Sequence, residues 1–489
     1  MSNFRFGAVF CVCLVLAGCA TRPVNPRIEN ADGATGYRIT THHPKFKEQQ
    51  SLVILAFSGG GTRAAAFSYG VLEYLHSTEV IGPKGNKTRL LDHVDLITGV
   101  SGGSFTALAY GLYGERLFDE YETRFLKRNV QGEIIARTFT PSYWGNLWSR
   151  GWGRSELAAD LYDEILFDDA TYGDLRRKEG PFILVSATDI STGGRFGFSQ
   201  LTFDIMCSNL DDVRLSRAAA ASSAVPVVLS SLTFNNYGGT CGFVAPAWTR
   251  LFLDAENPPR PAARALRSMR TMETYGDGKE RPFIHLVDGG VSDNVAMRGV
   301  LESLELMEAL HYIGEPTPLD NVHRIIVFVV NSLSSPPTSW DKSEKPPGMI
   351  ELMLRSAGVP IDHFSYESIE LLKDIGARWN TMKLIRNSPA VANSNDPKLA
   401  AGVRGPDIEI YAVDVSFAAL AESDPAEFAY LNEQPTSFVL PPEAVDRLRA
   451  AAGKIIADSL DFKRLLKDVG ATIVPPAVPP VQAAGKSGH

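Results

Sequence analysis

Apolar residues along this chain form two patterns, short continuous runs and longer runs with helical spacing. The runs within 52–57 and 93–100 are short and bounded by glycine or polar residues, as expected of strands buried on both faces. Further strands are expected at 181–190, 195–199, 282–288, 323–331 and 406–417. Helices are expected at 62–75, 104–114, 156–165, 298–310, 350–372 and 441–460. This alternation predicts an α/β protein with helices on both faces of a central sheet.

One serine lies in a glycine-rich turn between a predicted strand and a predicted helix. Ser101 is the centre of Gly99-Val100-Ser101-Gly102-Gly103, a G-x-S-x-G sequence. Small neighbours allow a turn sharp enough to expose the serine Oγ at a helix N-terminus, where unpaired N–H groups favour developing negative charge. The position predicts a nucleophile elbow with Ser101 as nucleophile and Gly99 and Gly103 as its small flanking residues.

A second glycine turn, Ser58 to Ala64, follows the first predicted strand. It fits the dinucleotide pattern G-x-G-x-x-[GA], but Glu79, which has the offset of the expected acidic residue, has no strand before it. A phosphate loop is excluded because no Gly-Lys-[Ser/Thr] follows. The remaining interpretation is a loop whose backbone N–H groups bind an oxyanion.

The base that activates Ser101 has to come from farther along the chain. None of the later histidines occupies an obvious loop at the end of a strand: His285, His311, His323, His363 and His489. Asp288 ends a predicted strand and precedes Gly289 and Gly290, at the edge of a sheet where ligands gather in open α/β folds. Burial and a fixed contact with the hydroxyl make an aspartate a workable base.

Three blocks of the sequence, taken together, resemble those of patatin-like phospholipases. They occur in the family's order as SGGGTRAAAFSYGVL at 58–72, GVSGGS at 99–104 and VDGGVSDN at 287–294. The stretches at 186–198 and 217–232 resemble further blocks of bacterial members, so the resemblance covers about 50–330 and reaches about 465. Ala64 and Ser58 depart from the commoner glycine and aspartate, and neither removes a reacting group.

The resemblance implies a three-layer α/β/α fold with a central, mostly parallel sheet. It also implies a Ser–Asp dyad without a catalytic histidine, with Ser101 as nucleophile and Asp288 as general base. The N–H groups of Gly60 and Gly61 would form the oxyanion hole, with Gly59 shaping the turn and Arg63 close by. Gly289 and Gly290 belong to the base motif.

The expected activity is therefore hydrolysis of phospholipid or lysophospholipid acyl esters through an acyl-serine, with no metal or organic cofactor. One alternative is an α/β-hydrolase-type esterase with a Ser-His-Asp triad that uses His363 or His323. A different class of protein, a non-catalytic envelope lipoprotein, is the other alternative. The sequence leaves the oligomeric state undetermined.

The N-terminus carries the pattern of an export signal. Arg5 precedes a short apolar run that ends in Leu16-Ala17-Gly18-Cys19, which resembles the lipobox of bacterial lipoproteins. The resemblance implies cleavage before Cys19 and lipidation of this residue. Ala20, in place of aspartate, favours the outer membrane. The expected partners are a membrane lipid substrate and the membrane itself.

These features divide the chain into five expected parts. They are a lipoprotein signal peptide at 1–18, a flexible tether at 19–50, the catalytic domain at 51–335, a C-terminal helical extension packed on that domain at 336–470 and a disordered tail at 471–489.

Net charge and cysteine content limit the expected partners and covalent links of the protein. The formal net charge of −8 makes a nucleic-acid partner unexpected, and no apolar run is long enough for a permanent membrane span. Two cysteines, Cys207 and Cys241, remain in the folded part, and a disulfide and two buried thiols both fit. The sequence has no C-x-x-C or H-E-x-x-H, so it gives no support for a zinc site.

Two further stretches have two interpretations each. Trp144, Trp148 and Trp152 recur every four residues, as in a packed aromatic stripe or in a face that enters lipid. The small residues of 218–226 fit either close packing or the wall of an acyl channel.

Overall fold

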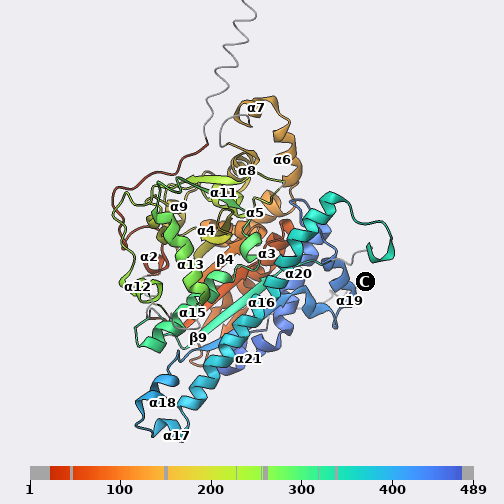
Figure 1. Ribbon diagram of the computed structural model, residues 1–489. Coiled ribbons are helices and arrows are strands. Elements are labelled where there is room, and N and C mark those ends of the chain that lie inside the picture. Colours follow the sequence, from red (N-terminus) through yellow and green to blue (C-terminus); the bar gives the residue numbers. More distant parts are fainter. Residues whose placement is uncertain are drawn as a thin grey trace, which may run out of the picture.

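The computed structural model describes residues 22–43, 48–147, 152–226, 228–254, 256, 263–317, 319–335 and 340–475. Within them the chain forms a central sheet with the strand order β10-β9-β1-β4-β5-β8-β7, with β6 paired to β5 (Figure 1). The strands are β1 Ser51–Phe57, β4 Leu96–Val100, β5 Phe182–Asp189, β6 Gly194–Gly197, β7 Leu232–Asn235, β8 Phe283–Val287, β9 Arg324–Asn331 and β10 Glu409–Ser416.

Strand direction separates the sheet into two parts. β10, β9, β1, β4 and β5 are mutually parallel, whereas β8 is antiparallel to both β5 and β7. A second, small sheet joins β11 Thr472–Ile473, β2 Glu79–Ile81 and β3 Lys87–Arg89. The central sheet is therefore mostly parallel, as expected.

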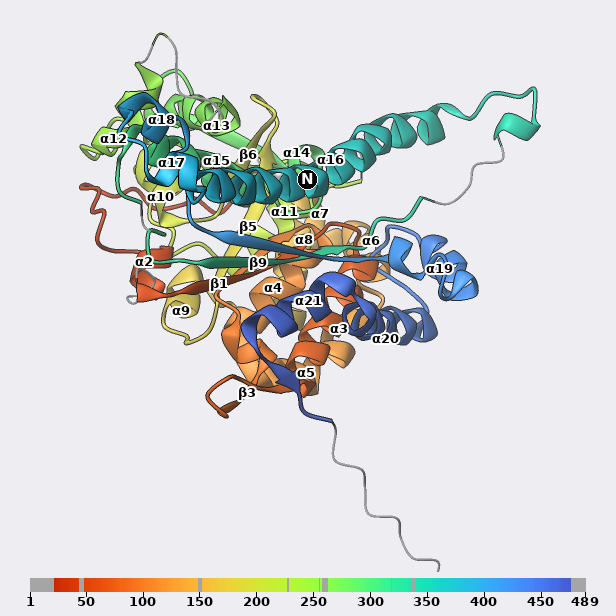
Figure 2. The same ribbon diagram turned by 90° about the horizontal axis from the view of Figure 1, so that it is seen from below.

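Helices cover both faces of the sheet (Figure 2). On one face lie α3 Thr62–Ser77, α4 Gly102–Tyr113, α20 Pro442–Asp458 and α21 Leu460–Val469. On the other lie α15 Arg298–Ile313 and α16 Met349–Arg386. The remaining helices are α2 Ile39–His42, α5 Leu117–Tyr121, α6 Val130–Thr138, α7 Pro141–Leu147, α8 Arg154–Tyr162, α9 Tyr172–Arg176, α10 Gln200–Ile205, α11 Leu215–Ser222, α12 Ala247–Leu253, α13 Ala263–Glu273, α14 Gly290–Asp293, α17 Pro389–Ala392, α18 Pro397–Gly402 and α19 Pro425–Asn432.

The continuous apolar runs have a direct structural reason. Successive side chains of a strand point to opposite faces, so a strand covered on both sides needs apolar residues at every position. In β1, Leu55 and Phe57 enter the core under α3 and α20, whereas Leu52 and Ile54 enter the core under α15 and α16. This two-sided burial confirms the predicted three-layer α/β/α arrangement.

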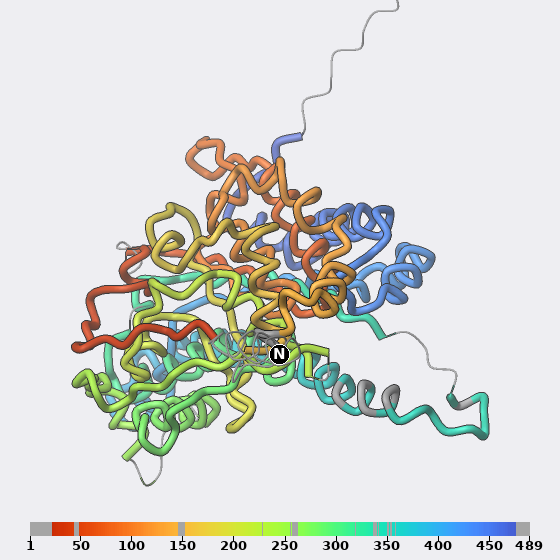
Figure 3. The backbone as a smooth tube through the Cα atoms, turned by 90° about the horizontal axis from the view of Figure 1, so that it is seen from above, coloured from red at the N-terminus to blue at the C-terminus, as the bar shows by residue number. Residues whose placement is uncertain are grey.

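The segment predicted to be a tether packs against the domain in its described part, residues 22–43. The N–H groups of Ile28 and Ala31 donate to the carbonyl oxygens of Cys207 and Cys241, both at 3.0 Å. The ring of Tyr37 is fully buried and stacks on Phe182 at 4.6 Å between centroids. Figure 3 shows this segment in red beside green segments of the domain. The tether prediction was wrong here because an aromatic anchor and backbone pairing outweigh the polar composition.

The two cysteines of the folded part are joined. Cys207 and Cys241 form a disulfide, with their Cα atoms 5.4 Å apart. This decides between the two alternatives that the sequence left open. The bridge lies under the N-terminal segment, since both cysteine carbonyls accept hydrogen bonds from it.

The C-terminal region differs from the predicted helical extension. Within 336–470, the strand predicted at 406–417 is present as β10, and it joins the central sheet through eight register pairs with β9, from Glu409↔Arg324 to Ser416↔Asn331. Helix α16 also continues to Arg386, beyond its predicted end, and passes through Pro360. The first residues of the predicted disordered tail form β11, which pairs with β2. This region therefore contributes an edge strand to the central sheet, in addition to the helices that cover it.

Candidate active site

Ser101 occupies the tight turn between β4 and α4. Its backbone has φ 49° and ψ −122°, an unfavourable region for a residue with a side chain. As the N-cap of α4, it places Oγ at the positive end of the helix dipole. The local geometry is thus that of the predicted nucleophile elbow, which we define as Gly99–Gly103.

The elbow is held close to the glycine turn of residues 58–62, which we call the glycine loop. A Cβ at Gly102 would lie 2.0 Å from the carbonyl oxygen of Gly61, so only glycine fits there. The N–H of Gly103 donates to the carbonyl oxygen of Ser58 at 3.2 Å, and Gly99 lies in β4 against Ser104. The two turns that the sequence singled out are therefore in direct contact.

Asp288 accepts a hydrogen bond from the hydroxyl of Ser101. The distance from Ser101 Oγ to Asp288 Oδ2 is 2.9 Å, and Asp288 Oδ1 accepts the N–H of Gly290 at 2.7 Å. Both partners are buried, at 5% exposure for Ser101 and 7% for Asp288. Burial raises the pKa of Asp288 to about 6, against the opposing effect of its two hydrogen bonds.

The path that brings Asp288 to Ser101 differs from the expected one. The sequence placed Asp288 at the carboxyl edge of a parallel sheet, but β8 runs antiparallel to β5 and pairs with it at only two positions. Asp288 follows the last paired residue of β8, and two hydrogen bonds to its backbone hold it in place. Its N–H donates to the carbonyl oxygen of Ala224, and its own carbonyl oxygen accepts from Thr188 Oγ1, both at 2.9 Å. The predicted position was right, but the reason for it was wrong.

Ser222 is a positioning residue that the sequence did not identify. The N–H of Ser101 donates to Ser222 Oγ at 2.9 Å, and the Ser222 hydroxyl donates to the carbonyl oxygen of Ser186 at 2.7 Å. The carbonyl oxygen of Ser222 also accepts the N–H of Gly289 at 3.0 Å, in the loop that carries Asp288. The small residues of 218–226 thus include one that connects the elbow to the base loop, defined here as residues 288–294.

The glycine loop presents free donors next to the elbow. Its ends are fixed, since the N–H of Gly59 donates to Asn294 O and that of Thr62 donates to Ser437 O, both at 2.8 Å. Gly60 and Gly61 have positive φ angles of 142° and 62°. Among the described residues, no acceptor pairs with the N–H groups of Gly60 and Gly61. Two backbone donors are therefore left available in the loop that contacts the elbow.

Arg63 lies behind the glycine loop and is buried, with 3% exposure. Its Nε donates to Ser332 O at 2.7 Å and its Nη1 to Gln434 O at 2.5 Å, while its Nη2 reaches Thr436 Oγ1 at 3.2 Å. Burial lowers the pKa of Arg63 to about 10, so it stays a cation at neutral pH. Arg63 therefore ties the loop to the segment 434–437, which sequence reasoning did not connect with the site.

The histidines of the alternative triad lie elsewhere. His323 precedes β9 and its N–H donates to Gln50 O, at the sheet edge opposite the elbow. His363 is exposed on α16, whereas Ser101 and Asp288 are buried. The hydroxyl of Ser101 is directed to a carboxylate, and this geometry favours the Ser–Asp arrangement over a triad.

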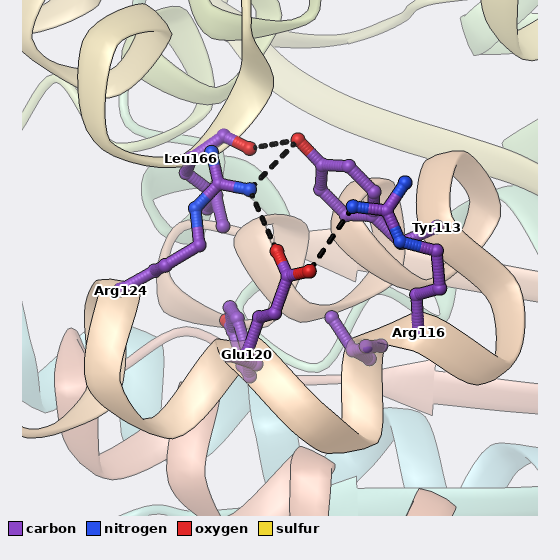
Figure 4. Close-up of a pocket in the computed structure, with 7 residues that line it drawn as sticks. Tyr113, Arg116, Glu120, Arg124 and Leu166 are labelled. Atoms are coloured by element: carbon purple, nitrogen blue, oxygen red, sulfur yellow. Dashed lines mark hydrogen bonds and ion pairs between the residues drawn. The ribbon is translucent and has the colours of Figure 1, made fainter.

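Another cluster of charged residues lies at the far end of α4 (Figure 4). There Glu120 pairs with Arg116 at 3.0 Å and with Arg124 at 3.2 Å, and Tyr113 donates to the carbonyl oxygen of Leu166. Tyr113 is separated from Ser101 by the length of α4, roughly 18 Å. Arg124 also pairs with Asp168 at 2.7 Å, so the charges of this cluster neutralise one another and it adds nothing to the site. In the part of the chain that the structure describes, no group of three or more His, Cys, Asp or Glu side chains could hold a metal ion.

With this geometry in place, the comparisons identify the family. The family model described as patatin-like phospholipase matches residues 55–301, which is half of the chain. The chain belongs to the patatin-like phospholipase family. A comparison with curated proteins found no match.

Several solved structures also match this chain at low sequence identity. Human GIVD cytosolic phospholipase A2 is 12% identical, with a TM-score of 0.42, and the match covers 88% of this chain and 65% of that one. Its complex with methyl gamma-linolenyl fluorophosphonate is 13% identical, with a TM-score of 0.36 and coverages of 89% and 62%. ExoU of Pseudomonas aeruginosa, in complex with SpcU, is 14% identical, with a TM-score of 0.19 and coverages of 86% and 88%. The chain thus spans less than two thirds of the human protein.

Among the described helices, none combines the length and apolar character needed to cross a bilayer. Cys19, the predicted lipidation site, and the predicted signal peptide lie outside the described residues, and so does Trp148.

Proposed function

We propose that this protein is a lipid acyl hydrolase that cleaves phospholipid or lysophospholipid esters through an acyl-serine intermediate. The observation that carries the proposal is the 2.9 Å contact between Ser101 Oγ and Asp288 Oδ2, made in a buried site next to two free backbone donors. Membership of the patatin-like phospholipase family supports the choice of a lipid ester as substrate.

In the acylation step, Ser101 Oγ attacks the ester carbonyl carbon while Asp288 Oδ2 accepts the hydroxyl proton. A carboxylate with a pKa near 6 is ionised at neutral pH and is a stronger base than an exposed aspartate. The carbonyl oxygen becomes an oxyanion, which the N–H groups of Gly60 and Gly61 bind. Such a donor stabilises the transition state by on the order of 3 kcal/mol.

The tetrahedral intermediate then collapses. Its bond to the leaving alcohol breaks, Asp288 returns the proton to that alcohol, and the acyl group remains on Ser101. Asp288 next takes a proton from water, whose oxygen attacks the acyl carbon. The second intermediate releases the fatty acid, and the proton returns to Ser101 Oγ.

The glycine loop is held in one conformation before any substrate binds, so its oxyanion donors are preorganised. Its two donors have no acceptor among the described residues, and Arg63 and Ser437 hold the loop in place. Donors that need no reorganisation are more effective than mobile ones. We propose that Arg63 supports the oxyanion hole through this anchoring.

The test compares wild type with Ser101→Ala and Asp288→Asn on phospholipid, lysophospholipid and short-chain ester substrates. Both variants are expected to lose at least a thousandfold in kcat/KM, and Ser101→Ala also loses labelling by a fluorophosphonate probe. Asp414→Asn, which changes a half-buried aspartate of β10, is the matched control and keeps wild-type activity. Loss of activity in His363→Ala or His323→Ala with retention in Asp288→Asn would establish a histidine triad instead.

We also propose that the protein is exported and held at the bacterial envelope, in the outer membrane, by a lipidated Cys19. The disulfide supports this location, since such bonds persist in oxidising compartments. Radiolabelled palmitate is expected to label wild type in growing cells and to leave the Cys19→Ser variant unlabelled. Equal labelling of both would place the lipid elsewhere.

A further inference from the structure

Exposed apolar side chains gather on a protruding pair of helices, α6 and α7, which we call the first projection (residues 130–147). Ile135 is 51% exposed, Phe139 73% and Trp144 51%. Between Ile134 and Leu147 the one charged residue is Arg137, which is neutralised by Glu164. In the tryptophan series, Trp152 is buried and stacks on Tyr143, so Trp144 is not part of a packed stripe. The tip of this projection is therefore apolar and nearly uncharged.

A second apolar stripe runs along the first half of α16, residues 349–366, which we call the second projection. Met349 is 79% exposed, Leu352 52%, Val359 39% and Tyr366 67%. Their spacing places them within about 100° of one another around the helix. The opposite face carries Ser365, which is 1% exposed. Figure 2 shows this half of α16 extending beyond the sheet.

The first projection begins next to the glycine loop. The N–H of Gln131 donates to Phe438 O at 3.2 Å, and Gln131 Oε1 accepts the hydroxyl of Ser437 at 2.8 Å. The carbonyl oxygen of Ser437 in turn accepts the N–H of Thr62. One residue therefore connects the base of α6 with the proposed oxyanion hole.

The second projection lies next to the base loop at its C-terminal end. Helix α14, which follows Asp288, packs against α16, and Arg298 lies 5.6 Å from the ring centroid of Phe364. Val291, three residues after Asp288, is itself 42% exposed. The two projections therefore flank Ser101 and Asp288 from the glycine-loop side and from the base-loop side.

The start of the described chain lies at the base of the first projection. Arg22 Nη1 and Arg217 Nη2 both donate to Thr233 O, at 3.1 and 3.2 Å, and Arg217 pairs with Glu156 at the start of α8. Helix α8 packs against α6, the first helix of that projection. Cys19 is three residues before Arg22, a reach of at most roughly 10 Å. A lipid on Cys19 would therefore enter a membrane close to the first projection.

We propose that the two projections are the surface by which this protein docks on a lipid bilayer, so that the side of the domain that carries Ser101 and Asp288 between them faces the membrane. The inference rests on the proposed lipid hydrolase function. Apolar and aromatic side chains with few charges suit the boundary of a bilayer, and a substrate that resides in the bilayer has to enter between them. The proposed anchor at Cys19 would hold the same face toward the lipid.

Two paired substitutions in the full-length chain test the surface. They are Phe139→Ser with Trp144→Ser, and Met349→Ser with Leu352→Ser. Leu384→Ser is the matched control, because Leu384 is a leucine on the same helix α16, 65% exposed but at the other end. The readouts are hydrolysis of phosphatidylcholine in vesicles and hydrolysis of a soluble, monomeric short-chain ester.

Each paired variant is expected to lose about tenfold or more of its activity on vesicles and less than twofold on the soluble ester, given the apolar area withdrawn from lipid. The control is expected to keep both activities. The proposal is overturned if vesicle activity falls no further than soluble-ester activity, or if Leu384→Ser has the same effect as the paired variants.

A second readout does not depend on catalysis. In the Ser101→Ala background, vesicles of brominated phosphatidylcholine are expected to quench part of the tryptophan fluorescence, and Trp144→Phe is expected to remove that part. Quenching in a protein that hydrolyses no phospholipid would support docking and refute the proposed substrate. If the vesicles quench no fluorescence, and the protein forms a dimer that Phe139→Ser dissociates, the surface is an interface between two copies of this chain. That result would overturn the proposal.

Discussion

The backbone N–H of Ser101 and the side chain of Ser222 are joined by a hydrogen bond of 2.9 Å. Ser222 in turn donates to Ser186 O, so the bond connects the elbow to β5 through a buried side chain. This contact holds Ser101 at a φ of 49°, where the hydroxyl is directed at Asp288. The strained turn is stabilised by a residue far from it in the sequence.

Ser222→Ala is accordingly expected to lower kcat/KM about tenfold, because it leaves the Ser101 N–H unpaired in a buried site. The same unpaired donor costs about 1–3 kcal/mol of stability. Ser223→Ala is the matched control, since the Ser223 hydroxyl donates to Ala219 O within the same helical segment. Steady-state kinetics and thermal melts of both variants provide the measurement. Equal losses in the two variants would show that Ser222 has no special role.

The raised pKa of Asp288 predicts the pH dependence of the reaction. If Asp288 is the general base, as proposed, it has to be ionised, so kcat/KM on a soluble ester is expected to rise as pH increases through about 6 and then level off. A profile that rises near pH 4 would mean that the carboxyl is not desolvated. A pH–rate curve from pH 4.5 to 8.5 distinguishes the two.

The same pKa also predicts a cost in stability. The carboxyl ionises near 3.8 in the unfolded chain and near 6 in the folded protein, so the folded state binds more protons between these values. Stability therefore falls as pH rises through this window, by up to about 3 kcal/mol, and the loss persists at higher pH. Asp288→Asn removes this loss, and its melting temperature is expected to exceed that of wild type more at pH 8 than at pH 4.5. Ser101→Ala, which keeps the carboxyl, is expected to retain the pH dependence of wild type. A constant difference between Asp288→Asn and wild type across pH would contradict the assignment.

The disulfide is expected to hold the N-terminal segment in place. A bridge that closes a span of 34 residues stabilises a domain by about 4 kcal/mol in the chain-entropy account. Reduction, or the double change Cys207→Ser with Cys241→Ser, should lower the melting temperature and expose Arg27 and Arg38 to trypsin. Cleavage at Lys84, in the exposed turn between β2 and β3 of the small sheet, is the control and should not change. An unchanged digestion pattern after reduction would show that the segment is held independently of the bridge.

Much of the site could be predicted because its requirements are local. A turn that places a serine at a positive φ beside closely packed backbone needs glycine neighbours, and Gly99, Gly102 and Gly103 supply them. The positive φ angles of the glycine loop likewise require glycine, here at Gly60 and Gly61. Such positions can be recognised in the sequence because few residue types satisfy them.

The direction of β8 could not be predicted in this way. A buried strand has the same apolar pattern whether it runs parallel or antiparallel to its neighbour, so the argument that placed Asp288 assumed the wrong direction. Nor did the sequence connect Gln434 and Ser437 with the glycine loop, since their contribution comes from backbone carbonyl oxygens, which any residue carries.

The sequence by itself determined the buried strands, the two glycine turns and the place of Ser101 between a strand and a helix, because local backbone geometry and two-sided burial restrict which residues can stand there. Only the tertiary structure decided how these parts meet. The Ser222 contact, the path of β8, the disulfide and the packing of residues 22–43 all join segments distant in the chain. Such contacts depend on the path of the whole backbone, and no short stretch of sequence carries that information.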